Sequence, residues 1–203
     1  MSEATTTEER VQALCDARDH DAAATLIIDQ HGPSIYGFLV ATMGDETAGA
    51  EVFSMWCEDV WKGLEGFRWS CSLKTWLYTV ARHAGHRWRR APFRKRHHQA
   101  LSQSPFLSKL VVDARKSITQ WRRTESRNQL QELRQELEPD DQTLLILRVD
   151  REMSWKEVAQ VMHGVDEEDA TLKRHAATLR KRFERVKREL RQMALDRGLI
   201  EPG

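Results

Sequence analysis

Apolar residues recur every three or four positions along most of the chain, the spacing that places side chains on one face of an α-helix. Three such faces comprise Ile35, Phe38, Leu39 and Thr42/Met43; Val52, Phe53, Trp56, Val60, Trp61 and Leu64; and Leu73, Trp76, Leu77, Val80, Ala81 and Ala84. Glycine and proline mark the expected breaks at residues 31–33, 44–45, 63–66, 91–92 and 138–139. Because no stretch alternates as a strand does, the pattern predicts an all-α protein.

The third face belongs to a segment, residues 67–90, that reads FRWSCSLKTWLYTVARHAGHRWRR. Ser72 can cap its helix, whose apolar stripe is expected to face the core. The other face carries Lys74, Tyr78, Arg82, His83, His86, Arg87, Arg89 and Arg90. Single-stranded nucleic acid requires cations for its phosphates and aromatic rings for its unstacked bases. Trp69 is expected to have the freest ring and Trp76 to lie in the core, while core and stacking roles stay open for Trp69 and Tyr78.

The chain has 203 residues and a net charge of +1, but acids and bases alternate in blocks. Residues 1–66 and 128–169 carry net charges of −10 and −8, whereas residues 67–127 and 170–203 carry +13 and +6. This alternation indicates two modules, each with an acidic and a basic half. Basic halves of this density are typical of proteins that contact nucleic-acid phosphates. Mutual neutralisation is the alternative, and it fails locally in residues 67–127, where acids are nearly absent.

Other features of the sequence limit the possible classes of protein. No apolar run reaches the length of a membrane span and the N-terminus lacks the apolar core of an export signal, so we expect a cytoplasmic protein without membrane insertion. Cys15, Cys57 and Cys71 follow no disulfide or redox pattern, which fits a reducing compartment. The histidine pairs at 83/86 and 97/98 lack zinc-site spacing. Motifs for phosphate loops and catalytic nucleophiles are missing, so we expect no enzyme, catalytic residue, metal or cofactor.

Residues 44–83, GDETAGAEVFSMWCEDVWKGLEGFRWSCSLKTWLYTVARH, resemble region 2 of sigma-70-family initiation factors of the two-domain extracytoplasmic-function type. The family run F-[RK]-x-x-x-[ST]-[FL]-x-T-W-L-Y-x-[IV]-A-R-N is matched at Phe67, Arg68, Ser72, Leu73, Thr75, Trp76, Leu77, Tyr78, Val80, Ala81 and Arg82. The resemblance implies a region that binds core RNA polymerase, then melts and reads the −10 promoter element. The loop at residues 68–71 would receive a flipped base, whose unstacking its contacts offset. The implied −10 DNA-binding residues are Arg68, Trp69, Ser70, Lys74, Tyr78, Arg82, His83 and Arg87.

Two positions depart from the region 2 pattern. The acidic helix that grips the polymerase clamp in this family reads AGAEVFS here, at residues 48–54, and keeps Glu51 as its matching acid. Neighbouring acids, including Asp59, are expected to compensate. The implied polymerase-binding residues are Asp45, Glu46, Glu51, Val52, Met55 and Glu58. The family's asparagine after Ala-Arg is replaced by His83, which is expected to shift the base preference at one promoter position.

Two segments of the C-terminal third resemble sigma region 4. Residues 137–148, LEPDDQTLLILR, are similar to its opening, and residues 153–162, MSWKEVAQVM, to the first helix of its helix-turn-helix. Ser154 and Glu157 form a capping box, and Ala159 is the small residue against which the second helix packs. The turn departs from the family pattern. His163 and Asp169 stand where a glycine and a buried apolar residue are usual.

The recognition helix therefore has two possible registers. One begins near TLKR, at residues 171–174, after a turn about three residues longer than usual. The other begins near TLRKRF, at residues 178–183, after about ten extra residues. We favour the second because ATLRKRFERVKREL resembles the family's G-T-V-x-S-R-L-x-R-A-x-x-x-L.

This second register places Leu179, Phe183, Val186 and Leu190 on one face of the recognition helix. Arginines outside it could read guanines and hold phosphates. The expected −35 DNA-binding residues are Thr178, Arg180, Lys181, Arg182, Arg185, Lys173 and Arg174. A basic helix that packs on a partner is the alternative.

The sequence thus predicts two small helical domains joined by a flexible basic linker: sigma region 2 at residues 1–96, the linker at 97–126 and sigma region 4 at 127–203. The resemblance implies a sigma factor that directs promoter-specific initiation through the −35 and −10 elements. It implies as partners core RNA polymerase (clamp and flap regions), double- and single-stranded promoter DNA, and an anti-sigma factor. The alternative function is a sigma-derived helix-turn-helix regulator or adaptor that no longer binds core polymerase. An RNA-binding protein would leave the C-terminal helix-turn-helix unexplained.

Overall fold

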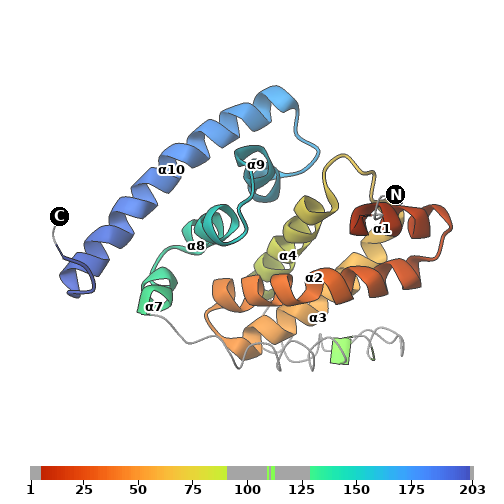
Figure 1. The fold of residues 1–203 in the computed structure, drawn as a ribbon, viewed down its shortest axis with the longest axis horizontal. Helices are drawn as coiled ribbons and strands as arrows, with labels where there is room; N and C mark the ends of the chain where they lie inside the picture. The colour runs from red at the N-terminus through yellow and green to blue at the C-terminus, as the bar shows by residue number, and fades with distance from the viewer. Residues whose placement is uncertain (1–5, 91–108, 110, 113–128, 202–203) are drawn as a thin grey trace, which may run out of the picture. The chain divides into compact units, whose positions relative to one another are not determined.

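The computed structural model describes residues 6–90, 109, 111–112 and 129–201, and all regular secondary structure in these residues is helical (Figure 1). The predicted all-α fold is therefore confirmed. The chain divides into two compact units, Met1–Thr124 and Glu125–Gly203. The predicted linker, residues 97–126, lies almost entirely outside the described residues, so its role and the assignment of regions to the units stay predictions.

The first unit is a bundle whose helices begin and end where local chemistry allows. It contains α1 (Thr7–Asp16), α2 (His20–Met43), α3 (Glu46–Gly63), the 3-10 turn η1 (Leu64–Gly66) and α4 (Leu73–Arg90). The side chains of Thr6, Asp19 and Asp45 accept backbone N–H groups at the starts of α1, α2 and α3. Gly44 ends α2 in the left-handed conformation, with φ of 71°. Helix α2 packs against α1, α3 and α4, and α4 also packs against α3.

The core of the bundle is aromatic and centres on Trp56. This residue is fully buried, and its ring stacks on Phe53 with centroids 5.3 Å apart. The indole N–H donates to the carbonyl of Leu77 at 3.1 Å, which ties α3 to α4. Phe53 in turn meets the ring of Tyr36 edge-on at 5.4 Å. A tryptophan can be buried this deeply because its one polar group has a partner.

The predicted break at residues 31–33 is wrong, because α2 continues through Pro33. Proline removes one backbone hydrogen bond and tends to kink a helix, yet tertiary packing can keep the helix continuous. Gly32 is buried here, and a Cβ atom at this position would lie 3.5 Å from the ring of Phe53. The buried residues Ile27, Ile28 and Ile35 on both sides of the break face the same core. Their packing holds the two halves of α2 in line.

The second unit consists of α7 (Gln129–Gln135), α8 (Pro139–Leu145), the π-helical turn η2 (Ile146–Asp150), α9 (Trp155–His163) and α10 (Asp169–Asp196). Pro139 occupies the first position of α8, where its missing N–H costs no hydrogen bond. The predicted capping box is confirmed: Ser154 accepts the N–H of Glu157 and the Glu157 carboxylate accepts the N–H of Ser154. Ala159 is fully buried under α10.

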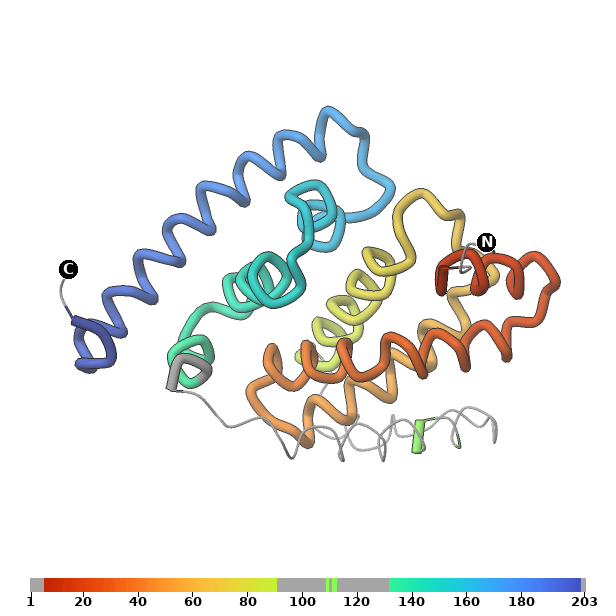
Figure 2. The backbone as a smooth tube through the Cα atoms, in the orientation of Figure 1, coloured from red at the N-terminus to blue at the C-terminus, as the bar shows by residue number. Residues whose placement is uncertain are grey.

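The structure selects the earlier of the two possible starts for the recognition helix. Helix α10 begins at Asp169 and continues without a break to Asp196, as the backbone trace shows (Figure 2). The register that begins near residue 178 is therefore wrong. Leu172 and Ala176 are buried and extend the stripe of Leu179 and Phe183 by two turns towards the N-terminus. Because these residues gain buried contacts, the chain is helical well before the family-like segment begins.

Candidate polymerase and nucleic-acid interfaces

The loop between η1 and α4 holds an aromatic stack. The Phe67 ring lies on Trp76 with centroids 4.6 Å apart and planes at 20°, and Trp69 also packs on Phe67, at 4.6 Å and 45°. Trp69 has a φ of 57°, a left-handed conformation that is uncommon and strained for a bulky residue. Its ring is half-buried against Phe67, so it is neither free nor enclosed in the core, and both roles stay open. Trp76 is also half-buried instead of enclosed in the core.

Helix α4 follows the loop directly and begins where the sequence predicted. Ser72 Oγ accepts the backbone N–H of Thr75 at 3.2 Å, which caps the first turn. The stripe predicted for the core is largely buried, with Leu73, Leu77, Ala81 and Ala84 at most 1% exposed. The cap and the stripe together fix which face of α4 turns to solvent.

Of the core and stacking roles left open for Tyr78, the structure supports the core, which contradicts its place among the expected −10 DNA-binding residues. Its side chain is 3% exposed and meets the Phe38 ring of α2 edge-on at 5.2 Å. Helix α4 packs against both α2 and α3, so its buried face is wider than the single stripe suggested. Tyr78 is consequently a core residue in this conformation and offers no ring to a base.

Several cations at the C-terminal end of α4 are bound within the bundle. Arg87 forms an ion pair with Asp59 of α3, and Arg89 donates to the carbonyl of Thr42 of α2 at 2.7 Å. The indole N–H of Trp88 donates to Glu51 at 2.8 Å. Of the other predicted −10 DNA-binding residues, Arg68, Ser70 and His83 are exposed, whereas Lys74 and Arg82 are half-buried. These exposed side chains thus lie in the loop and in the middle of α4.

Burial and neighbouring charges shift the pKa of several titratable groups of the bundle, among them His31, Asp59 and His83. Desolvation lowers the pKa of His83, and the charges of Arg82 and Arg87 lower it further. Burial likewise lowers the pKa of His31 on α2, with Glu8 opposing the shift. Burial raises the pKa of Asp59 although Arg87 opposes this. His83 is therefore predominantly neutral near pH 7, a form that can donate and accept hydrogen bonds at a base edge.

The six residues expected to bind polymerase divide into two groups. Val52 and Met55 are 0% and 7% exposed, so these two lie in the core of the bundle and not on a contact surface. The four acids are placed on or near the surface. Asp45 caps α3, Glu46 is exposed, Glu51 accepts the hydrogen bond from Trp88, and Glu58 pairs with Lys62 at 2.5 Å. They are spread along α3 from its N-cap, Asp45, to Glu58 in its second half.

In the second unit, α9 and α10 pack together across a short turn, in the segment for which the sequence predicts a helix-turn-helix. Lys173, Arg174, Thr178, Arg180 and Lys181 are exposed on the first half of α10. Asp169 binds Lys156 of α9 at 2.8 Å and Lys173 at 3.1 Å, and these lysines lower its pKa. Arg182 and Arg185 differ from the others, since both bind the carboxylate of Asp141. Nothing in the spacing of the sequence linked Asp141 to α10.

A further cluster surrounds the half-buried ring of Trp155, the first residue of α9. The guanidinium carbons of Arg148 and Arg180 lie 5.2 Å and 5.7 Å from its centroid, within range of a cation–π attraction. Phe183 meets the same ring edge-on at 5.5 Å. The aromatic position in the region 4-like motif was the sequence signal for this cluster, but Arg180 and Phe183 come from α10, and the spacing did not link them to Trp155.

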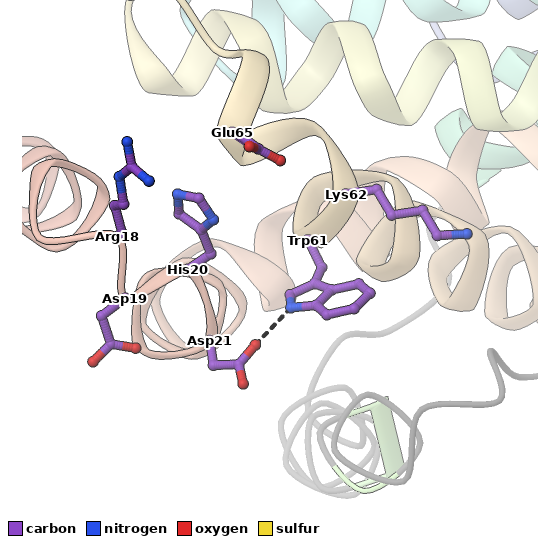
Figure 3. A pocket seen from close by; sticks show the side chains of 7 residues that line it. All are labelled: Arg18, Asp19, His20, Asp21, Trp61, Lys62 and Glu65. Atoms are coloured by element: carbon purple, nitrogen blue, oxygen red, sulfur yellow. Dashed lines mark hydrogen bonds between the residues drawn. The ribbon is translucent and has the colours of Figure 1, made fainter.

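An open pocket of about 490 Å³ lies elsewhere on the first unit, between the start of α2 and the end of α3 (Figure 3). Its lining consists of Arg18, Asp19, His20, Asp21, Trp61, Lys62 and Glu65. The Trp61 indole N–H donates to Asp21 at 2.7 Å across it. This mixed lining favours neither sign of charge.

Among the described residues, no three potential ligands gather as a metal site would, and no helix is long and apolar enough to cross a membrane.

Two comparisons with known proteins bear on these surfaces. Residues 27–95, which include the aromatic loop and all of α4, match the family Sigma-70 region 2. The RNA polymerase sigma factor YlaC of Bacillus subtilis (strain 168) is 31% identical over 130 residues, which cover 64% of this chain and 73% of that protein. The chain belongs to the sigma-70 family. It is a sigma factor of the extracytoplasmic-function type, and its partners as a family member are core RNA polymerase and promoter DNA.

The family match assigns most of the first unit's helical bundle to Sigma-70 region 2. The matched residues begin within α2 and end just beyond α4, so they cover the core built around Trp56 as well as the loop. Sigma factors are specificity subunits and not a class of enzymes. The family match to region 2 stops before α8, α9 and α10, so the assignment of the second unit to region 4 stays a prediction.

Proposed function

We propose that this sigma factor binds core RNA polymerase through α3, opens and reads the −10 element with the loop at residues 67–72 and α4, and reads the −35 element with α10. The observation that carries the proposal is the aromatic stack of Phe67, Trp69 and Trp76 in the region 2 segment. This stack stands beside exposed cationic and polar groups, the combination that unstacked bases and their phosphates require.

The strained backbone of Trp69 supports a role in base capture. A left-handed conformation costs on the order of 1–3 kcal/mol for such a residue, and strain of this kind is common at sites that bind ligands. Its ring packs at a tilt against Phe67. A flipped base could take over that contact while the loop relaxes, which would offset part of the few kcal/mol that unstacking costs. Arg68 and Ser70, both exposed, flank Trp69 and are available to the adjoining phosphates.

Along α4, His83 and the cations around it extend the proposed −10 surface. The lowered pKa of His83 favours a neutral ring that contacts a base edge over a charge that holds a phosphate. Lys74 and Arg82 supply positive charge on the same helix. Arg87 would have to leave Asp59 to take part, so its contribution is expected to be smaller.

For the polymerase contact, the exposed acid Glu46 and the half-buried acids Glu51 and Glu58 are the best candidates on α3. The hydrogen bond from Trp88 orients the Glu51 carboxylate. Size-exclusion chromatography with core polymerase tests this arrangement directly. Wild type should co-elute with core, and Glu51→Lys should weaken the complex by reversing the charge. Glu65→Lys, which reverses an exposed acid outside α3, is the matched control.

For the −35 element, the first turns of a recognition helix reach base edges in the major groove. The exposed residues Lys173, Arg174, Thr178 and Lys181 stand on these turns of α10. Arginine can bind guanine with two hydrogen bonds, and lysine adds contacts to bases or phosphates. The anti-sigma partner implied by the resemblance stays a prediction, as does contact with the polymerase flap.

Promoter opening tests the whole proposal. A holoenzyme assembled from wild type should make −10 thymines reactive to permanganate, and Trp69→Ala should reduce this reactivity without preventing assembly. Trp61→Ala removes another half-buried tryptophan and should leave opening intact. A chain that binds duplex DNA but never joins core would instead support the helix-turn-helix regulator. Equal opening by wild type and Trp69→Ala would show that base capture lies elsewhere.

A further inference from the structure

A buried carboxylate on α8 binds two arginines of α10. The side chain of Asp141 is 4% exposed. Its Oδ1 accepts a hydrogen bond from Nε of Arg182 at 2.5 Å, and its Oδ2 accepts one from Nη2 of Arg185 at 3.0 Å. Each carboxylate oxygen therefore serves a different guanidinium. Charge-assisted hydrogen bonds of this kind are among the stronger polar contacts in proteins.

The two arginines lie on or beside the outward face of α10. Arg174, Thr178, Lys181 and Arg185 follow one another at intervals of three or four residues, so their Cα atoms share one stripe of the helix. Arg185 belongs to this stripe, but its guanidinium binds Asp141 instead of extending freely. Arg182 stands at the border with α8, and its side chain is 32% exposed.

This arrangement lowers the charge that α10 can offer to DNA. The charge of a guanidinium bound to a buried carboxylate is partly offset, so Arg182 and Arg185 can neutralise a phosphate fully only by leaving Asp141, and a buried carboxylate deserted by both would be costly. Sequence-independent affinity for DNA increases with the number of phosphates neutralised, because each releases condensed counterions. Two arginines that stay on Asp141 therefore contribute less to that number than two free arginines would, although the Arg185 side chain is 59% exposed.

We propose that Asp141 is a positioning residue that fixes α10 against α8 and withholds Arg182 and Arg185 from DNA phosphates. The bases of the DNA are then recognised by side chains on the first turns of α10. Non-specific binding of DNA stays low relative to specific binding. The inference rests on the proposed role of α10 as the −35 reader. It revises the sequence prediction for Arg182 and Arg185, which become anchors of the helix.

The test measures DNA binding by the full chain as a function of salt, with a labelled duplex of mixed sequence as probe. Asp141→Asn removes the charge that holds the arginines. The plot of log K against log salt should become steeper by about one to two units, since each added phosphate contact contributes roughly 0.9. Enrichment of preferred sequences from a randomised duplex pool should decline in the same variant. Glu136→Gln, which releases Arg197 from an exposed pair near the end of α10, should change neither.

A triple variant, Asp141→Leu with Arg182→Met and Arg185→Met, covers the case in which Asp141→Asn does not fold. Replacing a whole buried ion cluster by apolar side chains commonly preserves folding. This variant should keep the wild-type salt dependence and enrichment, whereas Arg174→Ala should flatten the plot.

A triple variant whose slope falls by one to two units would overturn the inference, because the arginines would then contact DNA in wild type. So would a folded Asp141→Asn variant with an unchanged slope. A wild-type chain that enriches no sequence would overturn the −35 role of α10 itself.

Discussion

Helices α4 and α10 are both basic and amphipathic, but they use their cations differently. In α4, the cations at the C-terminal end bind groups on neighbouring helices, as Arg87 binds Asp59 and Arg89 the carbonyl of Thr42. In α10, the cations of the first turns are exposed, including Lys173 in its surface pair with Asp169, and the buried acid Asp141 binds Arg182 and Arg185 further along. The difference teaches that a count of lysines and arginines overstates the charge available to nucleic acid. The position of each cation relative to buried acids decides whether it is available.

The two units also differ in what holds their helices together. The first unit stacks large aromatic rings around Trp56. The second unit buries a charged and an amide side chain between its helices: Asp141 with its two arginines, and Gln142, whose amide donates to the carbonyls of Gln135 and Leu137. The first unit should accordingly be most sensitive to lost volume, and the second to lost polar partners.

The largest effect is expected for Trp56→Ala. Removing a fully buried tryptophan should lower the free energy of unfolding of the first unit by about 3–5 kcal/mol. Hydrogen exchange measured by mass spectrometry reports each unit separately, and protection should decrease in α2, α3 and α4 while that in α9 and α10 is kept. Trp61→Ala, at a half-buried position, is the control and should cost less. Equal loss in both units would contradict the separation of their cores.

Gly49→Ala should have the next largest effect, because α2 and α3 approach closely at this point. A Cβ atom on Gly49 would lie 2.6 Å from Cγ2 and 2.9 Å from Cα of Val40. The backbone contact cannot be relieved by a side-chain rotation, so the variant should lose about 1–3 kcal/mol in urea unfolding. Gly66→Ala is the matched control, since a Cβ atom on Gly66 would meet no neighbouring group within 4 Å. An unchanged unfolding midpoint for Gly49→Ala would show that the helices can separate at little cost.

The two capping boxes allow a direct comparison between the units at a smaller scale. Ser154→Ala should destabilise the second unit by about 1 kcal/mol, the usual cost of losing an N-cap. Thr6→Ala removes the equivalent contact from α1 and should cost less in thermal unfolding, because α1 lies at the edge of a larger core. Ser154→Asp, which retains a capping oxygen, should restore most of the loss. A larger effect at Thr6 would reverse this ranking.

The smallest effect concerns pH and is expected in the first unit. Folding lowers the pKa of His31 and His83, so below about pH 6.5 the unfolded chain binds more protons than the folded one. Above that pH both histidines are neutral in the folded and the unfolded chain, and the free energy of unfolding keeps its full value. It should decrease as the pH falls from there through their lowered pKa values. The raised pKa of Asp59 has the opposite sign and acts at lower pH. Urea titrations at several pH values should show a weaker dependence in a His31→Gln/His83→Gln variant. An unchanged dependence would assign it to other groups.

Local features of the sequence predicted local structure well. Ser72 and Ser154 cap their helices as expected, because a cap needs only residues within one turn. The stripe of α4 is likewise a property of its own helical period. Predictions that depended on neighbouring helices were less accurate. Tyr78 is buried because α2 covers it, and Val52 and Met55 are core residues where surface contacts were expected.

The sequence alone determined the helical class, the main apolar stripes and the resemblance to sigma region 2, since these follow from residue order and short-range hydrogen bonding. Tertiary structure decided the rest. It continued α2 through Pro33, began α10 at Asp169, and bound Arg182 and Arg185 to an acid some forty residues away. These outcomes depend on burial and charge pairing between segments distant in the chain. No local pattern records which distant group a side chain will meet.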